Sequence, residues 1–494
     1  MQLDKSSNEF QENDASCLSN SGRLCYLLRD HKYGSLTQLS FSLLHVISSL
    51  CTFLFHPRHS FTNEEGEEER GLAAALQPIV IEGTDFINSA TGARVQIVGV
   101  AYQPGGSSGY SPSTGVDPLS DGPTCLRDAA LMQRLGINAI RVYNVNPDLN
   151  HNLVVEAFKE FPNTMAFFAG NEVIDDFESS VNAPYMRAVT RDLKLYIAAN
   201  SPRYIPVGYS AADVRDILED SWNYLQCTTT GDAGDASRVD LFALNSYSWC
   251  GNATYRSSGY DILTSTFASS SVPVFLSEYG CNEVDGPRPW TEIAALYGEE
   301  MRETMSGGVV YEWTQEENNY GLVELSDNGD IQLMENYNNL QTQLGLLDFT
   351  VLEGQPGRNR PVTPPTCEAS LIQNTTFPTN FTLPATPAEA VTLIENSLDG
   401  ANQGRLVTLT SLRVEQGVQD AGGADIVNLA VEPVEDGEVN SPTRTGNGGP
   451  STSGTGTATG SGASGSASET GAASLVGVKA GGVVVGILGL LMNL

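Results

Sequence analysis

Two glutamates directly follow apolar runs of the kind that form buried strands. Glu172 comes after Asn171 in residues 167–173 (FFAGNEV), and Glu278 comes near the end of residues 272–280 (VPVFLSEYG). A strand that is buried on both faces would present each carboxyl where it leaves the core. A pair of carboxyls is what retaining glycoside cleavage requires, because one protonates the leaving oxygen and the other attacks the sugar carbon. Either motif alone is weak, since a glutamate at a strand end often only caps a helix.

The elements around these glutamates alternate between strands and helices, which is the pattern of parallel βα units. A hairpin is expected first, from residues 79–81 to a buried strand at 95–103. Helices are expected over residues 125–135, 183–200 and 291–305. Seven parallel strands are expected, at residues 97–103, 137–143, 165–172, 204–210, 239–247, 272–280 and 307–313. Seven strands are one short of a closed (β/α)8 barrel.

The missing strand has a definite place in the chain. Only 21 residues separate Tyr143 from Met165, which is enough for a loop and a short helix but not for a helix, a strand and a second helix. If the third unit is absent there, Glu172 ends the fourth strand and Glu278 ends the seventh. The C-terminal strand ends of a barrel meet on one face, so the two acids would face each other. The expected fold is therefore a TIM-type α/β barrel over residues 76–350 that lacks its third strand and helix.

The amino-acid composition excludes several classes of partner and catalytic site. With 26 Lys and Arg against 59 Asp and Glu, a net charge of −33 would repel phosphate backbones, so no nucleic acid partner is expected. Four of the five histidines precede residue 76, and only His151 lies in the body of the chain. This distribution nearly excludes a histidine-based triad or a zinc site. No metal and no cofactor is expected, and a neutral substrate fits best.

Ten short motifs carry a family resemblance. They are residues 99–103 (GVAYQ), 117–119 (DPL), 125–128 (CLRD), 140–145 (IRVYNV), 167–173 (FFAGNEV), 205–210 (IPVGYS), 245–251 (NSYSWCG), 277–284 (SEYGCNEV), 295–297 (ALY) and 306–312 (SGGVVYE). In this order, within residues 78–345, they resemble the fungal cell-wall β-1,3-glucanosyltransferases of glycoside hydrolase family 72. The resemblance implies that Glu172 is the acid/base and Glu278 the nucleophile of an enzyme that cuts β-1,3-glucan and passes the new end to another chain.

The same resemblance implies a sugar-binding groove lined by Gln103, Tyr143, Asn171, Tyr247 and Tyr311. Tyrosine suits this role because its ring stacks on a pyranose while its hydroxyl forms hydrogen bonds. Without the family, any one of these tyrosines could equally be a core residue. Donor and acceptor glucan chains are the expected partners. A plain β-1,3-glucan hydrolase and an inactive wall-binding protein remain the alternatives, the second because a barrel segment is missing.

Cysteine pairing is also implied by the resemblance. Five cysteines follow the N-terminal region, which is an odd number for a secreted protein. The family pattern pairs Cys250 with Cys281 and Cys227 with Cys367. It leaves Cys125 alone, because the relatives carry the partner of this cysteine, together with an acidic groove residue, in the segment that is missing here.

Both ends of the chain differ from the barrel in amino-acid composition. Residues 1–75 hold a signal-like apolar run at 39–55. This region is either an altered N-terminal sequence or a real signal anchor followed by a stalk. Residues 351–442 are expected to be a linker and a small β-like region. If the chain is secreted, Asn252, Asn374 and Asn380 are glycosylation acceptors.

The C-terminal end suggests attachment to a membrane. Residues 443–474 are almost entirely Gly, Ser, Thr and Ala, which predicts a flexible stalk. Residues 475–494 form an apolar tail of the kind that signals a glycosylphosphatidylinositol (GPI) anchor, with attachment expected within 463–473. A transmembrane helix is the competing interpretation. The expected location is the outer leaflet of the plasma membrane or the cell wall.

Overall fold

The computed structural model describes residues 77–106, 119, 121–143, 151–358, 362–398, 411–432, 434, 439–442 and 490–493. The N-terminal apolar run, the attachment region and the stalk lie outside these residues. Among the helices that are described, none has the length and the apolar character to cross a membrane.

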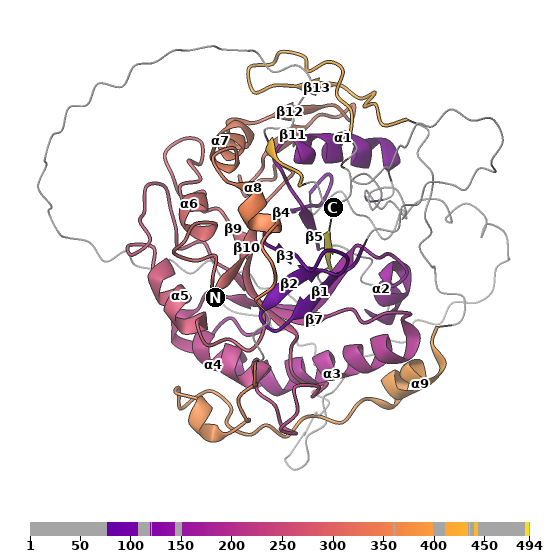
Figure 1. The fold of residues 1–494 in the computed structure, drawn as a ribbon, viewed down its shortest axis with the longest axis vertical. Helices are drawn as coiled ribbons and strands as arrows, with labels where there is room; N and C mark the ends of the chain where they lie inside the picture. The colour runs from indigo at the N-terminus through magenta and orange to yellow at the C-terminus, as the bar shows by residue number, and fades with distance from the viewer. Residues whose placement is uncertain are drawn as a thin grey trace, which may run out of the picture. The chain divides into compact units, whose positions relative to one another are not determined.

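Seven parallel strands form most of a barrel (Figure 1). They are β4 (Ile97–Ala101), β5 (Ala139–Val142), β6 (Thr164–Asn171), β7 (Val207–Ala212), β8 (Leu241–Asn245), β9 (Val274–Tyr279) and β10 (Met305–Val310). The order around the wall is β10-β4-β5-β14-β6-β7-β8-β9. Each of the seven strands expected from the sequence is confirmed. Nearly all of their apolar residues are buried, as at Phe167, Phe168 and Leu276, which is why continuous apolar runs predicted them.

The eighth place in the wall is filled by the far end of the chain. Strand β14 (Leu490–Asn493) lies between β5 and β6 and is antiparallel to both of them. Leu491 is in register with Arg141 on β5 and with Ala166 on β6. Within residues 151–163, the described part of the connection between β5 and β6, the one helix is the short α2 (His151–Phe158), as the sequence predicted. The sequence did not predict that part of the apolar tail would occupy the vacant place.

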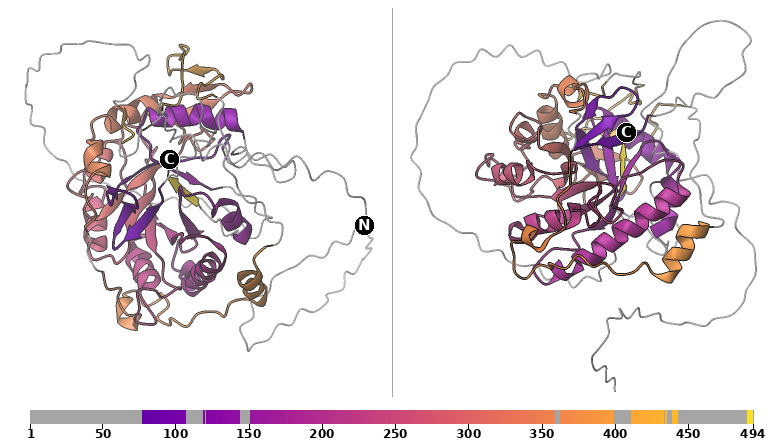
Figure 2. Two further views of the ribbon diagram at one scale, coloured as in Figure 1. Left: turned by 45° about the vertical axis from the view of Figure 1, so that its right-hand side comes forward. Right: turned by 60° about the horizontal axis from the view of Figure 1, so that its bottom comes forward.

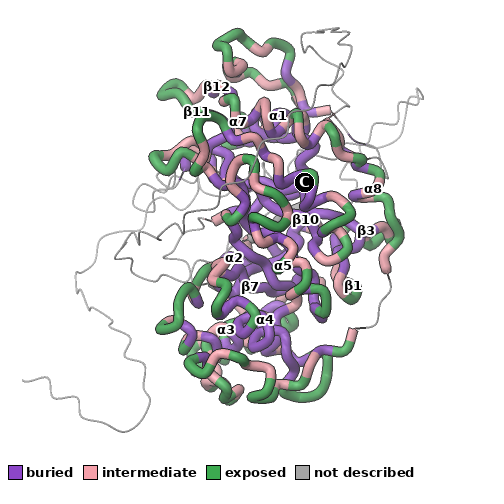
Figure 3. The backbone as a smooth tube through the Cα atoms, turned by 90° about the vertical axis from the view of Figure 1, so that its left-hand side faces the viewer, coloured by how far each residue is buried: buried purple, intermediate pink, exposed green. Residues whose placement is uncertain are grey.

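Helices surround the barrel, and Figure 3 shows the buried interior with exposed segments outside it. They are α1 (Gly122–Gln133), α3 (Ala183–Asn200), α4 (Arg215–Gln226), α5 (Tyr260–Phe267), α6 (Ile293–Leu296), α7 (Glu335–Leu344), α8 (Phe349–Glu353), α9 (Ala388–Asn396) and the 3-10 helices η2 (Ser179–Asn182) and η3 (Ala369–Leu371). The helix expected over 183–200 is confirmed. The helix expected over 291–305 is wrong beyond Leu296, because the chain turns near Gly298, a poor helix former.

Two small sheets flank the barrel. The first joins β1 (Ile79–Glu82), β2 (Asp85–Asn88) and β3 (Arg94–Val95) in a meander. The expected hairpin is therefore corrected: β1 pairs with β2, because Gly83 at φ 63° turns the chain back at once. The second sheet joins β11 (Val323–Leu325), β12 (Ile331–Leu333) and β13 (Val418–Gln419).

One disulfide, Cys227–Cys367, and helix α9 attach the region after the barrel to it. Cys227–Cys367 and Cys250–Cys281 are both formed, which confirms the implied pairing. Cys125 is also disulfide-bonded, so the expectation that it stands alone is wrong. Part of the expected β-like region is helical instead, because it contains helix α9. This helix packs against α3 (Figure 2).

Candidate active site

The Glu278 carboxylate lies at the C-terminal end of β9 and accepts hydrogen bonds on both oxygens. Its Oε1 accepts from the Tyr143 hydroxyl at 2.9 Å and from Arg141 Nη1 at 3.0 Å. Its Oε2 accepts from the Tyr247 hydroxyl at 2.7 Å. Burial raises the pKa of both tyrosines well above the ordinary value, so both hydroxyls stay protonated as donors. The carboxylate is thereby held in one orientation.

Glu172 follows the last residue of β6 and has a left-handed backbone, with φ at 51°. This conformation is rare for residues other than glycine and is concentrated at functional sites. Its backbone N–H donates to Ser210 O at 2.8 Å, so the strained turn is fixed to β7. Loss of hydration raises the pKa of the Glu172 carboxyl, and the charge of Glu278 raises it further, while Asn245 and Arg141 act in the opposite direction. The two predicted acids therefore lie close enough to influence each other.

Arg141 on β5 connects the strands across the barrel interior. It is fully buried, and its Nη2 donates to Asn171 Oδ1 at 2.7 Å. Its Nη1 donates to Glu278 and to Asn245 Oδ1 at 3.1 Å. A buried ion pair of this kind is costly unless its hydrogen bonds are satisfied. Polar groups on β6 to β9 accept from both Nη atoms, whereas the buried Nε has no hydrogen-bond partner among the described residues. Sequence reasoning assigned no role to Arg141.

Asn171 belongs to the same network. Its Oδ1 accepts from Arg141, from Ser210 Oγ at 2.8 Å and from Asn245 Nδ2 at 3.0 Å. The side-chain oxygen of Asn171 is thus occupied within the protein, and its amide N–H groups are the donors that a sugar hydroxyl could use. Asn245 and Ser210 lie inside motifs that carried the resemblance, but only the fold shows that they meet Asn171.

Four tyrosine rings form a cluster around Glu278. Tyr311 makes edge contacts with Tyr143 and Tyr247, with both ring centroids at 6.2 Å. Tyr320, which sequence reasoning missed, lies 5.3 Å from Tyr311 and 5.4 Å from Tyr247. Tyr320 belongs to a polar loop, so no pattern in the sequence distinguished it. Partly exposed rings beside a held carboxylate can stack on a sugar.

Gln103 and Glu312 also lie at this end of the barrel, after β4 and β10. Gln103 follows β4, and its buried Nε2 has no hydrogen-bond partner among the described residues. A buried N–H donor without an acceptor costs free energy, and a hydrogen bond to a bound hydroxyl would remove that cost. The Gln103 amide can therefore serve as a donor to a sugar. Glu312 follows β10 and accepts from Asn318 Nδ2 at 2.8 Å. Burial, with charge from Glu316 and Glu278, raises the pKa of Glu312 to about 7.

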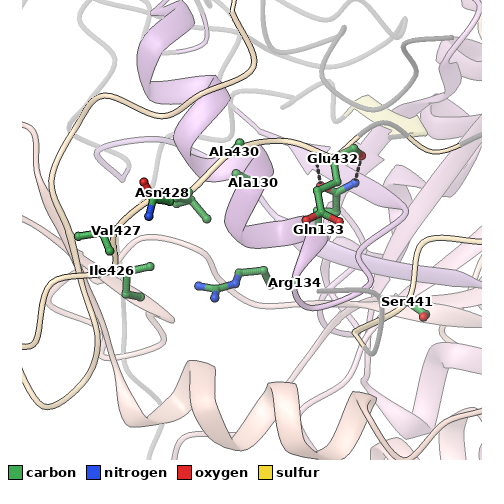
Figure 4. Close-up of a pocket in the computed structure, with 10 residues that line it drawn as sticks. Ala130, Gln133, Arg134, Ile426, Val427, Asn428, Ala430, Glu432 and Ser441 are labelled. Carbon is green, nitrogen blue, oxygen red and sulfur yellow. Dashed lines mark hydrogen bonds between the residues drawn. The ribbon is translucent and has the colours of Figure 1, made fainter. Parts of the chain in front are cut away.

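A separate hollow lies between helix α1 and the segment that follows β13. Figure 4 shows Gln133 and Arg134 on its α1 side, facing residues 426–432. Gln133 exchanges two hydrogen bonds with the backbone of Glu432, which fixes this segment to the helix. The hollow shares no lining residue with the tyrosine cluster, and none of its groups resembles a catalytic pair.

Fold and site together define a barrel with two interacting glutamates at the C-terminal strand ends. A profile of the glucanosyltransferase family, glycoside hydrolase family 72, matches residues 69–154 and 152–347, which is more than half of the chain. The protein therefore belongs to this family, and the resemblance seen in the sequence is confirmed. The two matching segments meet inside the short connection between β5 and β6, where the sequence predicted a missing unit.

Individual relatives agree with the family assignment. The chain is 48% identical to the 1,3-beta-glucanosyltransferase gel2 of Aspergillus fumigatus, over 75% of this chain and 86% of the relative. It is 38% identical to the probable 1,3-beta-glucanosyltransferase GAS3 of Saccharomyces cerevisiae, over 68% of this chain and 76% of the relative. A solved structure of Saccharomyces cerevisiae Gas2, a mutant in complex with laminaritetraose and laminaripentaose, has a TM-score of 0.52 and 30% identity over 64% of this chain and 76% of that one.

Proposed function

We propose that this protein is a retaining β-1,3-glucan transglycosylase that cleaves and rejoins cell-wall β-1,3-glucan. The observation that carries the proposal is the Glu278 carboxylate at the end of β9, held by Tyr143, Tyr247 and Arg141. Glu172, at the end of β6, is near enough for the charge of Glu278 to raise its pKa. The names of the relatives and the oligosaccharides bound by Gas2 support the choice of substrate.

The chemistry follows from the two environments. Glu172, whose pKa is raised, gives its proton to the glycosidic oxygen, while Glu278 Oε attacks the anomeric carbon. The bond from that carbon to the leaving sugar breaks, and a covalent glycosyl-enzyme ester forms. Glu172, now ionised, then takes the proton from an incoming hydroxyl, whose oxygen displaces Glu278 from the anomeric carbon. The product keeps the original configuration after two inversions.

The incoming hydroxyl decides between transfer and hydrolysis. A sugar competes with water only if the protein holds it in place, because positioning is worth a large effective concentration. The cluster of Tyr143, Tyr247, Tyr311 and Tyr320 offers ring surface for that purpose, and Gln103 and Asn171 offer amide donors. This supports transfer as the main reaction, with hydrolysis as the alternative outcome.

The proposal includes attachment to the cell surface through a GPI anchor. The apolar tail at 475–494 and the stalk at 443–474 support it. Because anchoring removes the tail, β14 would be present only in the chain that still carries residues 490–493. Mass spectrometry of the C-terminal peptide from the surface protein tests this, and a peptide that retains residue 493 would contradict anchoring.

Glycosylation at Asn252, Asn374 and Asn380 belongs to the same proposal. Asn252 and Asn380 are exposed and Asn374 is partly exposed, so an oligosaccharide could be accommodated. Asn374 Oδ1 accepts from the hydroxyl and the N–H of Thr376, and Asn380 Oδ1 accepts from the N–H of Thr382. Digestion with a glycosidase specific for N-linked sugars should lower the mass of the secreted protein.

The decisive experiment replaces the nucleophile. Glu278→Gln should lower both cleavage and elongation of laminari-oligosaccharides at least about 10⁴-fold, since the amide cannot form the ester. Glu353→Gln is the matched control, because Glu353 is also a shielded glutamate but bonds Asn138 before β5, at the opposite end of that strand. Sizing the products distinguishes the candidates: longer chains indicate transfer, and shorter chains alone indicate hydrolysis. A parent chain that binds glucan without changing it would favour the inactive wall-binding protein.

A further inference from the structure

Arg288 is a second buried arginine near the site, and its contacts are almost all to backbone oxygens. Its Nη1 donates to Tyr311 O at 2.7 Å and to Gly280 O at 3.2 Å. Its Nη2 donates to Tyr320 O and, at 3.3 Å, to Gly321 O. One guanidinium thus joins the segments that follow β9 and β10 to the loop that carries Tyr320.

Asn336 on helix α7 and the Trp290 ring hold Arg288 in place. Its backbone N–H donates to Asn336 Oδ1 at 2.9 Å, and Asn336 Nδ2 donates to Gly321 O at 3.0 Å. The Trp290 ring lies under the guanidinium at 4.1 Å, and the Trp290 indole N–H donates to Asn336 O at 2.9 Å. Helix α7 therefore supplies a fixed base for Arg288, independent of the catalytic carboxyls.

Only arginine suits this arrangement. Its planar group presents several N–H donors in a fixed geometry, whereas lysine has one compact ammonium. Burial lowers the pKa of Arg288 to about 10, with the charge of Glu292 opposing that shift, so the group remains a cation under ordinary conditions. None of its described hydrogen bonds goes to Glu172 or Glu278.

We propose that Arg288 is a positioning residue for the sugar-binding wall, which sets the rings of Tyr311 and Tyr320 relative to Glu278. The path is short, because Tyr320 contacts both Tyr311 and Tyr247, and the Tyr247 hydroxyl donates to Glu278. This rests on the proposed function, in which these rings bind glucan. Loss of the arginine lets the loop move without removing any group that reacts.

The test compares Arg288→Lys with Arg238→Lys. Arg238 is also buried and also donates to backbone carbonyls, those of Gln226 and Ala233. It lies before the N-terminal end of β8, whereas Glu278 lies at the C-terminal end of the neighbouring strand β9. We expect Arg288→Lys to raise KM for laminari-oligosaccharides about tenfold and to lower the ratio of transfer to hydrolysis, with kcat for cleavage changed less than about threefold. Arg238→Lys should change none of these.

A second variant keeps the test decisive if Arg288→Lys folds poorly. Asn336→Ala removes two hydrogen bonds of the supporting frame and should raise KM about threefold in the same direction. An unchanged KM and transfer ratio in both variants, or a loss confined to kcat, would overturn the positioning role. A parent chain with no activity on glucan would instead defeat the proposed function, so the two failures are distinguishable.

Discussion

The barrel wall is regular from β6 to β9 and irregular between β5 and β6. In the regular part every neighbouring pair is parallel, and the strand ends present Glu172 and Glu278. In the irregular part the antiparallel strand β14 takes the place of a βα unit. The candidate site is nevertheless continuous across both parts, because Arg141 on β5 donates hydrogen bonds to residues on β6, β8 and β9. Side chains inside the barrel thus connect what the backbone pattern does not.

Removing Arg141 should have the largest effect of any change that leaves the two glutamates intact. Arg141→Met would leave Glu278 and Asn171 without their buried cation, which typically costs about 3–5 kcal/mol when one partner of a buried pair is removed. We expect kcat/KM to fall about 10³-fold and the free energy of unfolding to fall by several kcal/mol. Denaturant unfolding and product analysis check this. Activity within tenfold of the parent would show that the β5 side of the site is dispensable.

The two tyrosines that hold Glu278 give a direct comparison of the two parts of the wall. Tyr143 follows β5 in the irregular part, and Tyr247 follows β8 in the regular part. Each Phe substitution removes one hydrogen bond to a charged group, which is worth about 1.5–3 kcal/mol. We therefore expect Tyr143→Phe and Tyr247→Phe each to lower kcat about 10- to 100-fold. A much smaller loss for Tyr143→Phe would mean that the β5 side is poorly fixed in solution.

All seven parallel strands of the wall could be predicted from the sequence, among them the two that carry the glutamates. Apolar runs located β6 and β9, and the end of each run located Glu172 and Glu278, because a strand buried on both faces has a local signature. The role of Arg141 could not be predicted, because a charged residue inside a buried strand only interrupts the apolar signature. The hydrogen-bond partners of Arg141 also come from segments that are distant in the sequence. The place of β14 could not be predicted either, since it depends on a vacancy in the assembled wall.

The contribution of β14 can be measured by changing its backbone alone. Proline at 491 would remove an N–H from a strand paired on both sides, whereas alanine at 491 keeps it. In the full-length chain we expect Leu491→Pro to lower the free energy of unfolding by about 2 kcal/mol relative to Leu491→Ala. Hydrogen exchange should accelerate in β5 and β6 but not in β8. Equal stability of the two variants would show that β14 is not part of the folded wall.

The effect expected at the other end of β5 appears only as pH rises. Asn138 precedes β5, accepts from Val98 N–H at 2.9 Å and donates to Glu353 Oε1 at 2.9 Å, so it fixes this strand to β4 and α8. Burial raises the pKa of Glu353 from its ordinary 4.5 to about 7. The folded state therefore holds the proton more tightly than the unfolded state, and the stability it contributes is complete below pH 4.5 and is lost as pH rises through about 7.

Glu353→Gln removes this titration while keeping an oxygen that can accept from Asn138. We expect the variant to match the parent at pH 4.5 and to be more stable by about 2 kcal/mol at pH 8, where the parent must bury a charge. Glu292 and Glu312 also have a pKa of about 7, so only the difference between the two proteins isolates Glu353. A difference that is constant with pH, or largest in acid, would mean that this carboxyl does not hold its proton and that β5 is anchored by Asn138 and its backbone partners alone.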